Sequence, residues 1–201
     1  MSRFFRWLNV ILLLALLVGG PLAYAKHLKS NFRNFGVVHD GVLYRSGQLS
    51  KAGMTRAIYD YGIKTVVTLR DGKNPGDPPP DAAEEKFCLD EELYYYRLPY
   101  RSKSRVQSPW IREAGTAPID EYVNQFLSVM DDNLKYPVLV HCYAGKNRTG
   151  AFVAIYRMEY EHWSNEEAIK ELKAKGYENL HEHNDICSYL ETYEPRWKRA
   201  N

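Results

Sequence analysis

Hydrophobic positions in this chain fall into short runs and into longer stretches with helical spacing. The short runs are apolar, several are rich in β-branched residues, and turn residues bound them, which is typical of strands. They predict strands at Gly41–Gly47, Lys64–Leu69, Leu93–Leu98 and Val138–Val140. The longer stretches predict helices over residues 50–61, 82–89, 119–134, 149–160 and 164–176, with a helical remainder through Trp197.

Strands and helices alternate along most of the sequence. Such alternation predicts an α/β fold in which helices flank a central, mainly parallel sheet. The chain has 201 residues, of which 45% are hydrophobic and 13% aromatic, so one domain of ordinary size can bury a core. The formal net charge is only +2, which confers no general affinity for polyanions, and we expect no nucleic-acid partner.

The first 25 residues have a different pattern. Arginines at positions 3 and 6 precede an apolar stretch from Trp7 to Val18, and the segment ends on Ala23-Tyr24-Ala25. A basic start, an apolar middle and a small-residue end are typical of a secretory signal peptide. Residues 7–25 also reach the length of the shortest membrane-spanning helices, roughly 17–25 residues. We therefore expect residues 1–25 to be a signal peptide cleaved after Ala25, or else a membrane tether. Residues 26–201 then form a domain that is exported, in or facing the periplasm.

Three cysteines are present, Cys88, Cys142 and Cys187, so at least one thiol is free. The sequence contains no CxxC pair and no dense disulfide framework. Cys88 and Cys187 fit the ordinary role of a small buried hydrophobic residue. Whether either of them can reach Cys142 and form a protective disulfide is left open by the sequence.

Cys142 lies where a predicted strand meets a predicted helix. The strand ends at His141, the connecting loop runs from Cys142 to Arg148, and the helix begins at Thr149. Ligands of α/β proteins gather at the carboxyl ends of strands, and a helix N-terminus there offers free N–H groups and a positive dipole end. The same field favours the thiolate of a cysteine. We therefore expect Cys142 to be a nucleophile seated beneath a bound phosphate.

The loop supplies the other groups that phosphate chemistry needs. Arg148 can hold two phosphate oxygens at once with its planar guanidinium, and Lys146 adds a point charge. Thr149 can donate its hydroxyl to the sulfur of Cys142. Glycine removes steric crowding where the backbone curls round a ligand. The expected phosphate-binding residues are Tyr143, Ala144, Gly145, Lys146, Asn147 and Arg148.

The stretch from His141 to Gly150 has the form HCxxGxxRTG and resembles the active-site loop of protein tyrosine and dual-specificity phosphatases. Further segments, Leu43–Gln48 and Ile63–Arg70 among them, look like bacterial atypical dual-specificity phosphatases, several of which are exported or membrane-tethered. The likeness covers most of residues 36–180. It implies the dual-specificity phosphatase fold, a cysteinyl-phosphate intermediate, and no metal or other cofactor.

The resemblance also implies a general acid, an aspartate on a loop upstream of the cysteine. That loop should begin after Leu98-Pro99, but the sequence there carries no carboxylate. Asp120 is the candidate we select, and it has the alternative role of stabilising the first turn of a helix. Glu113 reads as a solvated loop charge. Asp71 reads as a turn residue, with orienting Arg148 or serving as the acid as its alternative roles. His141 is expected to order the loop by hydrogen bonding, since metal partners for it are not evident.

Three functions remain open from the sequence. The first is a phosphatase for protein phosphotyrosine, with phosphoserine and phosphothreonine as further substrates. The second is a phosphatase for phosphoinositides or inositol polyphosphates, which Lys146 and the alternating Arg101, Lys103 and Arg105 support through their charge. The third is a non-catalytic phosphate-binding module, which the intact Cys142 and Arg148 disfavour.

Overall fold

The computed structural model describes residues 7, 11–22, 31–72, 77–98, 108–113, 115–177 and 184–199. The basic loop residues Arg101, Lys103 and Arg105 lie outside the described residues, as does the start of the loop expected to carry the general acid.

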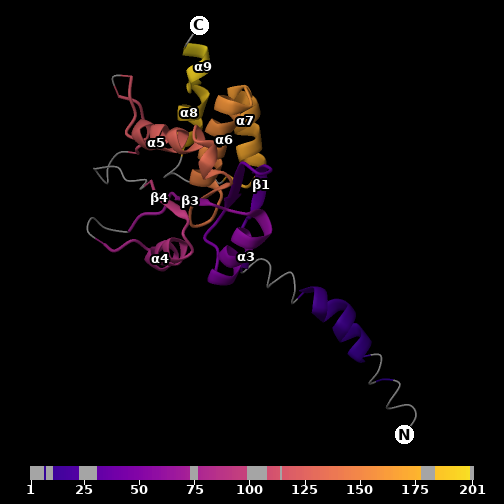
Figure 1. Ribbon diagram of the computed structural model, residues 1–201. Coiled ribbons are helices and arrows are strands. Elements are labelled where there is room, and N and C mark those ends of the chain that lie inside the picture. Colours follow the sequence, from indigo (N-terminus) through magenta and orange to yellow (C-terminus); the bar gives the residue numbers. More distant parts are fainter. Residues whose placement is uncertain are drawn as a thin grey trace.

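A five-stranded sheet forms the centre of the molecule, in the order β1-β2-β5-β3-β4 (Figure 1). Its strands are β1 (Gly36–His39), β2 (Leu43–Ser46), β3 (Thr65–Thr68), β4 (Tyr94–Arg97) and β5 (Val138–His141). Strands β2, β5, β3 and β4 run parallel to one another, and β1 pairs antiparallel with β2. The predicted mainly parallel α/β fold is confirmed. Strand β1 was not predicted, because its apolar run consists of Val37 and Val38 alone, and of these only Val38 is buried.

Two helices cover one face of the sheet, α3 (Lys51–Tyr61) and α4 (Ala82–Asp90). Ser50 caps α3 by accepting a hydrogen bond from the Gly53 amide at 3.1 Å. Gly62 ends that helix in the left-handed conformation, with φ +65°. Both ends of α3 agree with the sequence prediction.

The opposite face is covered by α5 (Asp120–Met130), α6 (Asn147–Tyr160), α7 (Asn165–Ala174) and α8 (Asn184–Glu191) (Figure 1). A capping box of Ser164 and Glu167 starts α7, as predicted. Helix α5 ends earlier than expected, since the 3-10 helix η2 (Asn133–Lys135) follows it.

The expected helical C-terminus is divided in two. Helix α8 ends where the side-chain amide of Asn165 donates to the carbonyls of Leu190 and Tyr193, at 2.7 and 2.8 Å. Pro195 cannot donate a backbone hydrogen bond, so it suits the start of a new helix, and α9 (Arg196–Arg199) follows it.

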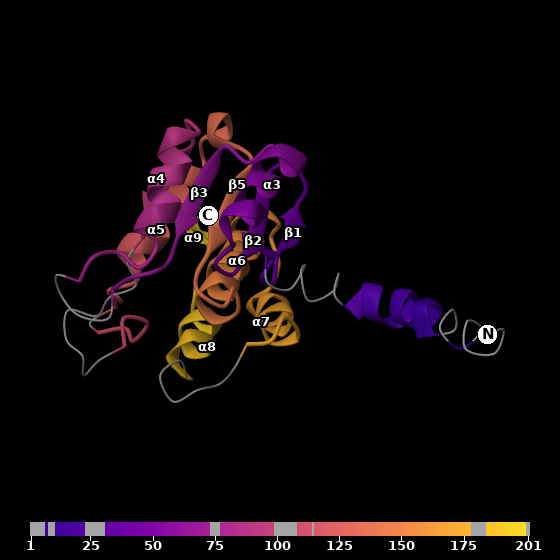
Figure 2. The ribbon, with the colours of Figure 1, turned by 90° about the horizontal axis from the view of Figure 1, so that it is seen from below.

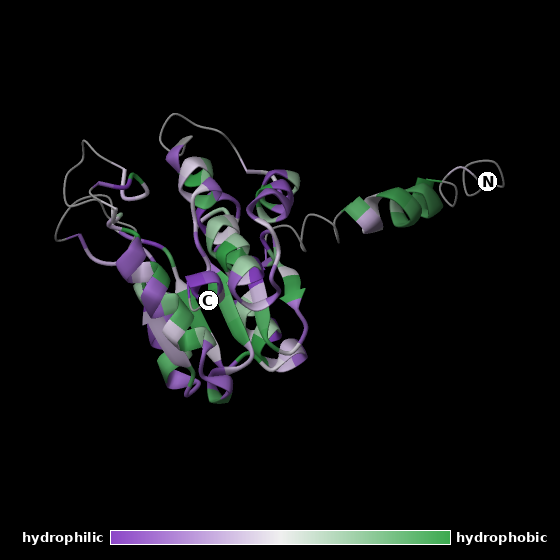
Figure 3. Cartoon of the chain, turned by 90° about the horizontal axis from the view of Figure 1, so that it is seen from above, coloured by the Kyte–Doolittle hydropathy of each residue, from purple (hydrophilic) through white to green (hydrophobic). Residues whose placement is uncertain are grey.

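The core consists of two apolar layers, because successive strand residues face opposite sides of the sheet. Val138 and Val140 of β5 pack with α5, α6, α7 and α8, whereas Leu139 packs with α3 and α4. Hydrophobic colouring is strong in the central part of the sheet and in the helix of residues 11–22 (Figure 3). The carboxyl ends of the parallel strands lie at one edge of the sheet, and the two core layers pack on its two faces.

Residues 11–22 are helical, with a π-helical stretch η1 (Ala15–Gly19), and all of their described side chains are exposed. Figures 1 and 2 draw this helix apart from the sheet. Among the described residues, no helix combines the length and the apolar character that crossing a membrane requires. Residues 8–10 and 23–30 lie outside the described part, so the assignment of residues 1–25 stays a prediction.

Phe126 tests the larger core layer. Its side chain is fully buried and meets Phe152 edge-to-face, with ring centroids 5.3 Å apart. We expect Phe126→Ala to lower the free energy of unfolding by about 3–5 kcal/mol, through lost burial and a new cavity. Denaturant unfolding measures this change. Leu134→Ala is the control, because Leu134 is 76% exposed and should change stability by less than about 0.5 kcal/mol. Equal losses in both variants would contradict this packing.

Candidate active site

The loop from Cys142 to Lys146 joins the central strand β5 to the N-terminus of α6. Strands β2 and β3 flank β5, so the loop emerges at the middle of the carboxyl edge of the sheet. This is the position at which α/β proteins hold ligands. The amide of Gly150 already bonds to the Lys146 carbonyl at 2.7 Å, so α6 begins directly at the loop.

Three successive carbonyl groups of the loop are bound by donors that lie outside it. The Tyr143 carbonyl accepts the Gln48 amide at 2.9 Å, and the Ala144 carbonyl accepts the side-chain amide of Asn34 at 2.7 Å. The Gly145 carbonyl accepts Nη2 of Arg45 at 2.8 Å. All three carbonyl oxygens therefore point away from the centre of the loop.

The N–H of a trans peptide points opposite to its C=O. The outward carbonyls of residues 143, 144 and 145 consequently turn the amides of Ala144, Gly145 and Lys146 inward. One of these amides is seen to do so: the Gly145 N–H donates to Sγ of Cys142 at 3.2 Å. Inward amides of this kind form an anion nest, and they stabilise a thiolate by the same charge.

Gly145 is required at its position by both conformation and space. Its φ is +74°, which disfavours other residues, and an added Cβ would lie 2.3 Å from the backbone nitrogen of Gly47. Cys142, at the floor of the loop, is only 5% exposed.

Arg45 is a buried cation behind the loop, and it was not predicted as a site residue. The residue is 5% exposed. Burial lowers the pKa of its guanidinium, while the charges of Glu171 and of the Cys142 thiolate favour the protonated form. A lone arginine within the apolar strand β2 was the signal that could have identified it.

His141 anchors the loop from the other face of the sheet. Its ring is fully buried. The Nδ1 atom lies 3.3 Å from the Cys142 carbonyl, and Nε2 lies 2.8 Å from Oε1 of Glu84 in α4. Glu84 also accepts the hydroxyl of Tyr95 at 3.1 Å and the side-chain amide of Gln48. The expected ordering role of His141 fits this geometry.

Asp81 joins Glu84 and His141 to form a group with metal-ligand chemistry, whose donor atoms lie within 4.8 Å of one another. Asp81 accepts Oγ1 of Thr68 at 2.6 Å and also pairs with Arg97. Burial would raise the pKa of Asp81, but the hydrogen bond from Thr68 and the pair with Arg97 bring it below its usual value. Both carboxylates are thus already satisfied by protein donors, which fits a hydrogen-bond network better than a metal site.

Arg148 and Thr149 lie in the first turn of α6, which begins at Asn147 rather than at the predicted Thr149. Nη1 of Arg148 donates to the Leu69 carbonyl, just after β3, at 3.2 Å. Thr149 is fully buried, and its hydroxyl donates to the Ser46 carbonyl at 3.4 Å. The proposed donation from Thr149 to the sulfur stays a prediction. The Lys146 side chain runs beside Gly176, close to the end of α7.

Tyr143 forms an exposed rim of the site. Its side chain is 59% exposed. The guanidinium groups of Arg33 and Arg70 lie over the ring, 4.4 and 5.2 Å from its centroid. A hydrogen bond from Arg33, together with its charge, lowers the pKa of Tyr143. Neither arginine was selected from the sequence, because both reach the loop from distant segments.

Asp120, the selected general acid, stands at the N-terminus of α5. Its Oδ2 accepts the Ala117 amide at 2.8 Å, and its Oδ1 accepts the Tyr189 hydroxyl at 2.6 Å. This is the helix-start role named as the alternative, and the acid role stays a prediction. Asp71 accepts the Gly72 amide at 2.8 Å, as a turn residue does. Glu113 forms an isolated backbone bridge with Thr116.

All three cysteines are free thiols. Cys88 is buried in the layer beneath α3 and α4, apart from the layer that contains Cys142. Burial, together with the nearby carboxylate of Glu84, raises the pKa of the Cys88 thiol to about 12. A thiol that stays protonated is a poor nucleophile. A disulfide from either cysteine to Cys142, which the sequence leaves open, is not formed in this structure.

Comparisons with known proteins agree with this geometry. A family model described as "DSP-PTPase phosphatase fused to NAD+ Kinase" matches residues 24–187. The dual specificity protein phosphatase OPG106 of monkeypox virus is 36% identical over 99 residues, 48% of this chain and 57% of that protein. The chain spans little more than half the length of the first curated relatives it matches.

Solved structures share the fold. The core catalytic domain of the PP-IP phosphatase SIW14 from S. cerevisiae superposes with a TM-score of 0.61 at 18% identity, covering 85% of this chain and 91% of that one. TpbA of P. aeruginosa in complex with pTyr superposes with a TM-score of 0.59 at 23% identity, covering 84% and 91%. At these identities the likeness establishes the fold.

Glu84 can be tested against its neighbour Glu85. Glu84→Gln places an NH₂ group where the carboxylate accepts hydrogen bonds on both oxygens, so a buried donor loses its partner. We expect the free energy of unfolding to fall by about 1–3 kcal/mol. Glu85 pairs with Arg97 at a more exposed position, and Glu85→Gln should cost less than about 1 kcal/mol. Urea unfolding of both variants measures the difference, and equal losses would contradict an anchoring role for Glu84.

Proposed function

The chain belongs to the DSP-PTPase family of phosphatases, and from this premise we propose that it hydrolyses phosphomonoesters through a cysteinyl-phosphate intermediate. The observation that carries the proposal is that the carbonyls of residues 143–145 are bound on the outer side of the loop. Peptide planarity then turns the next three amides inward, as a ring above Cys142. A thiolate beneath such a ring faces the phosphorus of a bound phosphate directly.

The proposed reaction has two steps. Sγ of Cys142 attacks phosphorus, the bond from phosphorus to the ester oxygen breaks, and that oxygen takes a proton as it leaves. Water then attacks the cysteinyl phosphate, releasing inorganic phosphate and the thiolate. The inward amides and Arg148 stabilise charge on the phosphate oxygens in both transition states. Asp120 is our candidate for the proton donor of the first step.

Protein phosphotyrosine is the substrate we propose first, with phosphoserine and phosphothreonine as further substrates. The relative OPG106 is named a dual specificity protein phosphatase, and the structural neighbour TpbA was solved with pTyr. Both names support this class of substrate.

Inositol polyphosphates or phosphoinositides are the second candidate. The neighbour SIW14 is named a PP-IP phosphatase. Arg33 and Arg70 at the Tyr143 rim support the idea as well, because multiply charged substrates favour cationic surroundings.

We further propose that residues 1–25 take the protein out of the cytoplasm, either as a cleaved signal peptide or as a tether facing the periplasm. The exposed apolar side chains of residues 11–22 support this. N-terminal sequencing of the protein from a Gram-negative bacterial host tests it: a chain that begins at Lys26 indicates cleavage, and an uncleaved chain in the membrane fraction indicates a tether. An uncleaved chain in the cytoplasm would contradict both.

Turnover of a chromogenic aryl phosphate tests the chemistry, because its good leaving group needs little help from an acid. We expect Cys142→Ser to abolish turnover, and Arg148→Lys to lower kcat by a factor on the order of 100 or more, since lysine cannot hold two oxygens. Wild-type protein that binds phosphate analogues without turnover would instead establish a binding module.

A phosphotyrosine peptide and an inositol hexakisphosphate sample, compared by phosphate release, separate the two substrate classes. We expect the higher kcat/KM for the peptide. The reverse order would replace the first substrate proposal with the second.

A further inference from the structure

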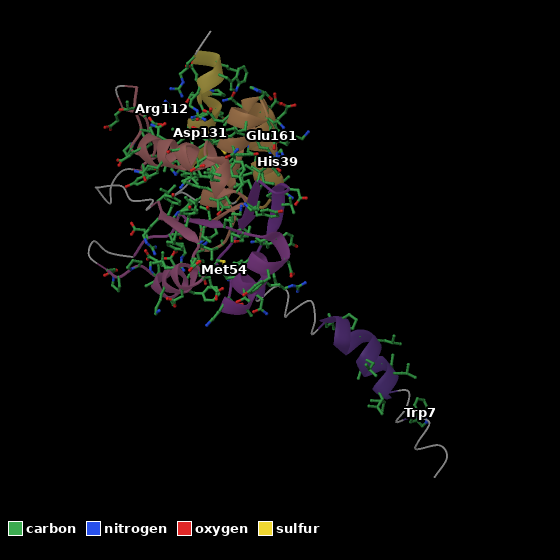
Figure 4. All side chains as sticks on the ribbon, viewed as in Figure 1. Trp7, His39, Met54, Arg112, Asp131 and Glu161 are labelled. Atoms are coloured by element: carbon green, nitrogen blue, oxygen red, sulfur yellow. The ribbon has the colours of Figure 1, made fainter. Side chains whose placement is uncertain are left out.

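A cavity of about 250 Å³ opens beside the candidate active site, on the face of the sheet covered by α3 and α4. Its walls are mainly apolar and come from Leu49, Met54, Pro80, Ala83 and Phe87. Figure 4 shows Met54 between α3 and α4. These residues follow the carboxyl ends of β2 and β3 or lie near the first turns of the two helices, so the cavity lies at the same edge of the sheet as the phosphate loop.

The cavity and the loop share a wall. Gln48 and Arg70 line the cavity, and both contact the loop residue Tyr143. The Gln48 amide donates to the Tyr143 carbonyl at 2.9 Å, and the Arg70 guanidinium lies 5.2 Å from the Tyr143 ring centroid. Nη1 of Arg70 also donates to Oε1 of Gln48 at 2.7 Å, which closes the wall. A substrate held in the loop therefore has the cavity at its side.

The charged residues around the cavity suit a ligand that places an apolar group inside it and an anionic group beside it. Its two carboxylates, Asp81 and Glu84, are already engaged by Arg97 and His141. The cation of Lys51 lies at the margin, 5.2 Å from the Phe87 ring, and Arg70 forms the side next to the loop. A phosphopeptide can place its anionic phosphate near these cations and an apolar side chain against the walls. An inositol polyphosphate has no apolar group that could contact the walls.

The volume also limits the guest. Pockets that enclose a whole small ligand have volumes of roughly 300–1,000 Å³. A cavity of about 250 Å³ is therefore suited to one side chain rather than to a complete second ligand.

We propose that this cavity is a substrate subsite that takes one apolar side chain, close in sequence to the phosphorylated residue of a phosphopeptide. The proposal rests on the protein phosphatase function proposed above and adds a rule of substrate choice to it. Apolar subsites of this kind distinguish side chains by factors of about 10 to 200.

A positional set of phosphotyrosine peptides tests the subsite. Each peptide carries leucine at one of the three residues on either side of the phosphotyrosine, with serine at the others. We expect wild-type protein to prefer leucine at one position by about tenfold or more in kcat/KM, which is about 1.4 kcal/mol. Equal turnover of all the peptides would overturn the subsite and leave the phosphatase function standing.

Ala83 and Ala82 provide a matched pair of variants. Both are exposed residues in the first turn of α4, but only Ala83 lines the cavity. Ala83→Phe fills the cavity and should reduce the leucine preference in kcat/KM to less than about threefold. Ala82→Phe should keep the preference of the wild type. Thermal melting is measured for both, and Ala83→Leu, a strong helix former, replaces Ala83→Phe if that variant melts early.

The remaining outcomes are also decisive. A leucine preference that survives in the Ala83 variants would place the selecting site elsewhere and overturn the proposal. If wild-type protein hydrolyses the aryl phosphate but no phosphopeptide, the substrate proposal fails together with the subsite, while the phosphatase chemistry stands.

A short-chain phosphoinositide is the last substrate to be compared. Ala83→Phe could lower the turnover of the phosphoinositide and leave the turnover of every peptide unchanged. The cavity would then bind an acyl chain, and the peptide proposal would be wrong.

Discussion

The peptide units from Tyr143 to Lys146 can turn their amides inward because their carbonyl groups find donors outside the loop. Gln48, Asn34 and Arg45 supply those donors, and each comes from a different position in the N-terminal half of the chain. Without them, the carbonyl dipoles would be free to face the phosphate and repel it. The anion site is thus preorganised by contacts on its outer side.

Two anchors hold this loop from opposite faces of the sheet. Arg45 binds the Gly145 carbonyl within the layer of Cys142, where burial lowers its pKa but the thiolate charge favours its cationic form. His141 points to the other face and pairs with Glu84. Successive residues of a strand alternate in direction, so the change of face between His141 and Cys142 follows from the geometry of β5. The loop is therefore fixed by both layers of the core rather than by one.

The residues around the loop favour phosphopeptides over inositol polyphosphates as substrates. Charge at Tyr143, from Arg33 and Arg70, suits any anionic group next to the phosphate. The cavity lined by Met54 and Phe87 is apolar and adds a requirement that inositol polyphosphates do not meet. A site that combines both features is better suited to a phosphopeptide with mixed character than to a uniformly charged small molecule.

The sequence by itself determined the strand–loop–helix setting of Cys142, the parallel α/β fold and most helix boundaries, because these depend on local signals. Apolar runs, the Ser50 cap and the capping box of Ser164 act within a few residues of where they stand. Strand β1 escaped prediction, since its apolar run is only Val37 and Val38, and its pairing with β2 makes it a strand. Helix α5 was predicted too long because apolar Leu134 continued the spacing past the true end at Met130.

Tertiary structure alone decided which distant residues support the site. Asn34 and Ala144 are 110 positions apart, Arg45 and Gly145 are 100 apart, and Arg148 and Leu69 are 79 apart. Local pattern carries no information on such pairs, because they meet only when β2, β3 and β5 align in one sheet. The nucleophile could be found from its own neighbours, whereas the groups that aim the loop at a phosphate became visible only in the folded chain.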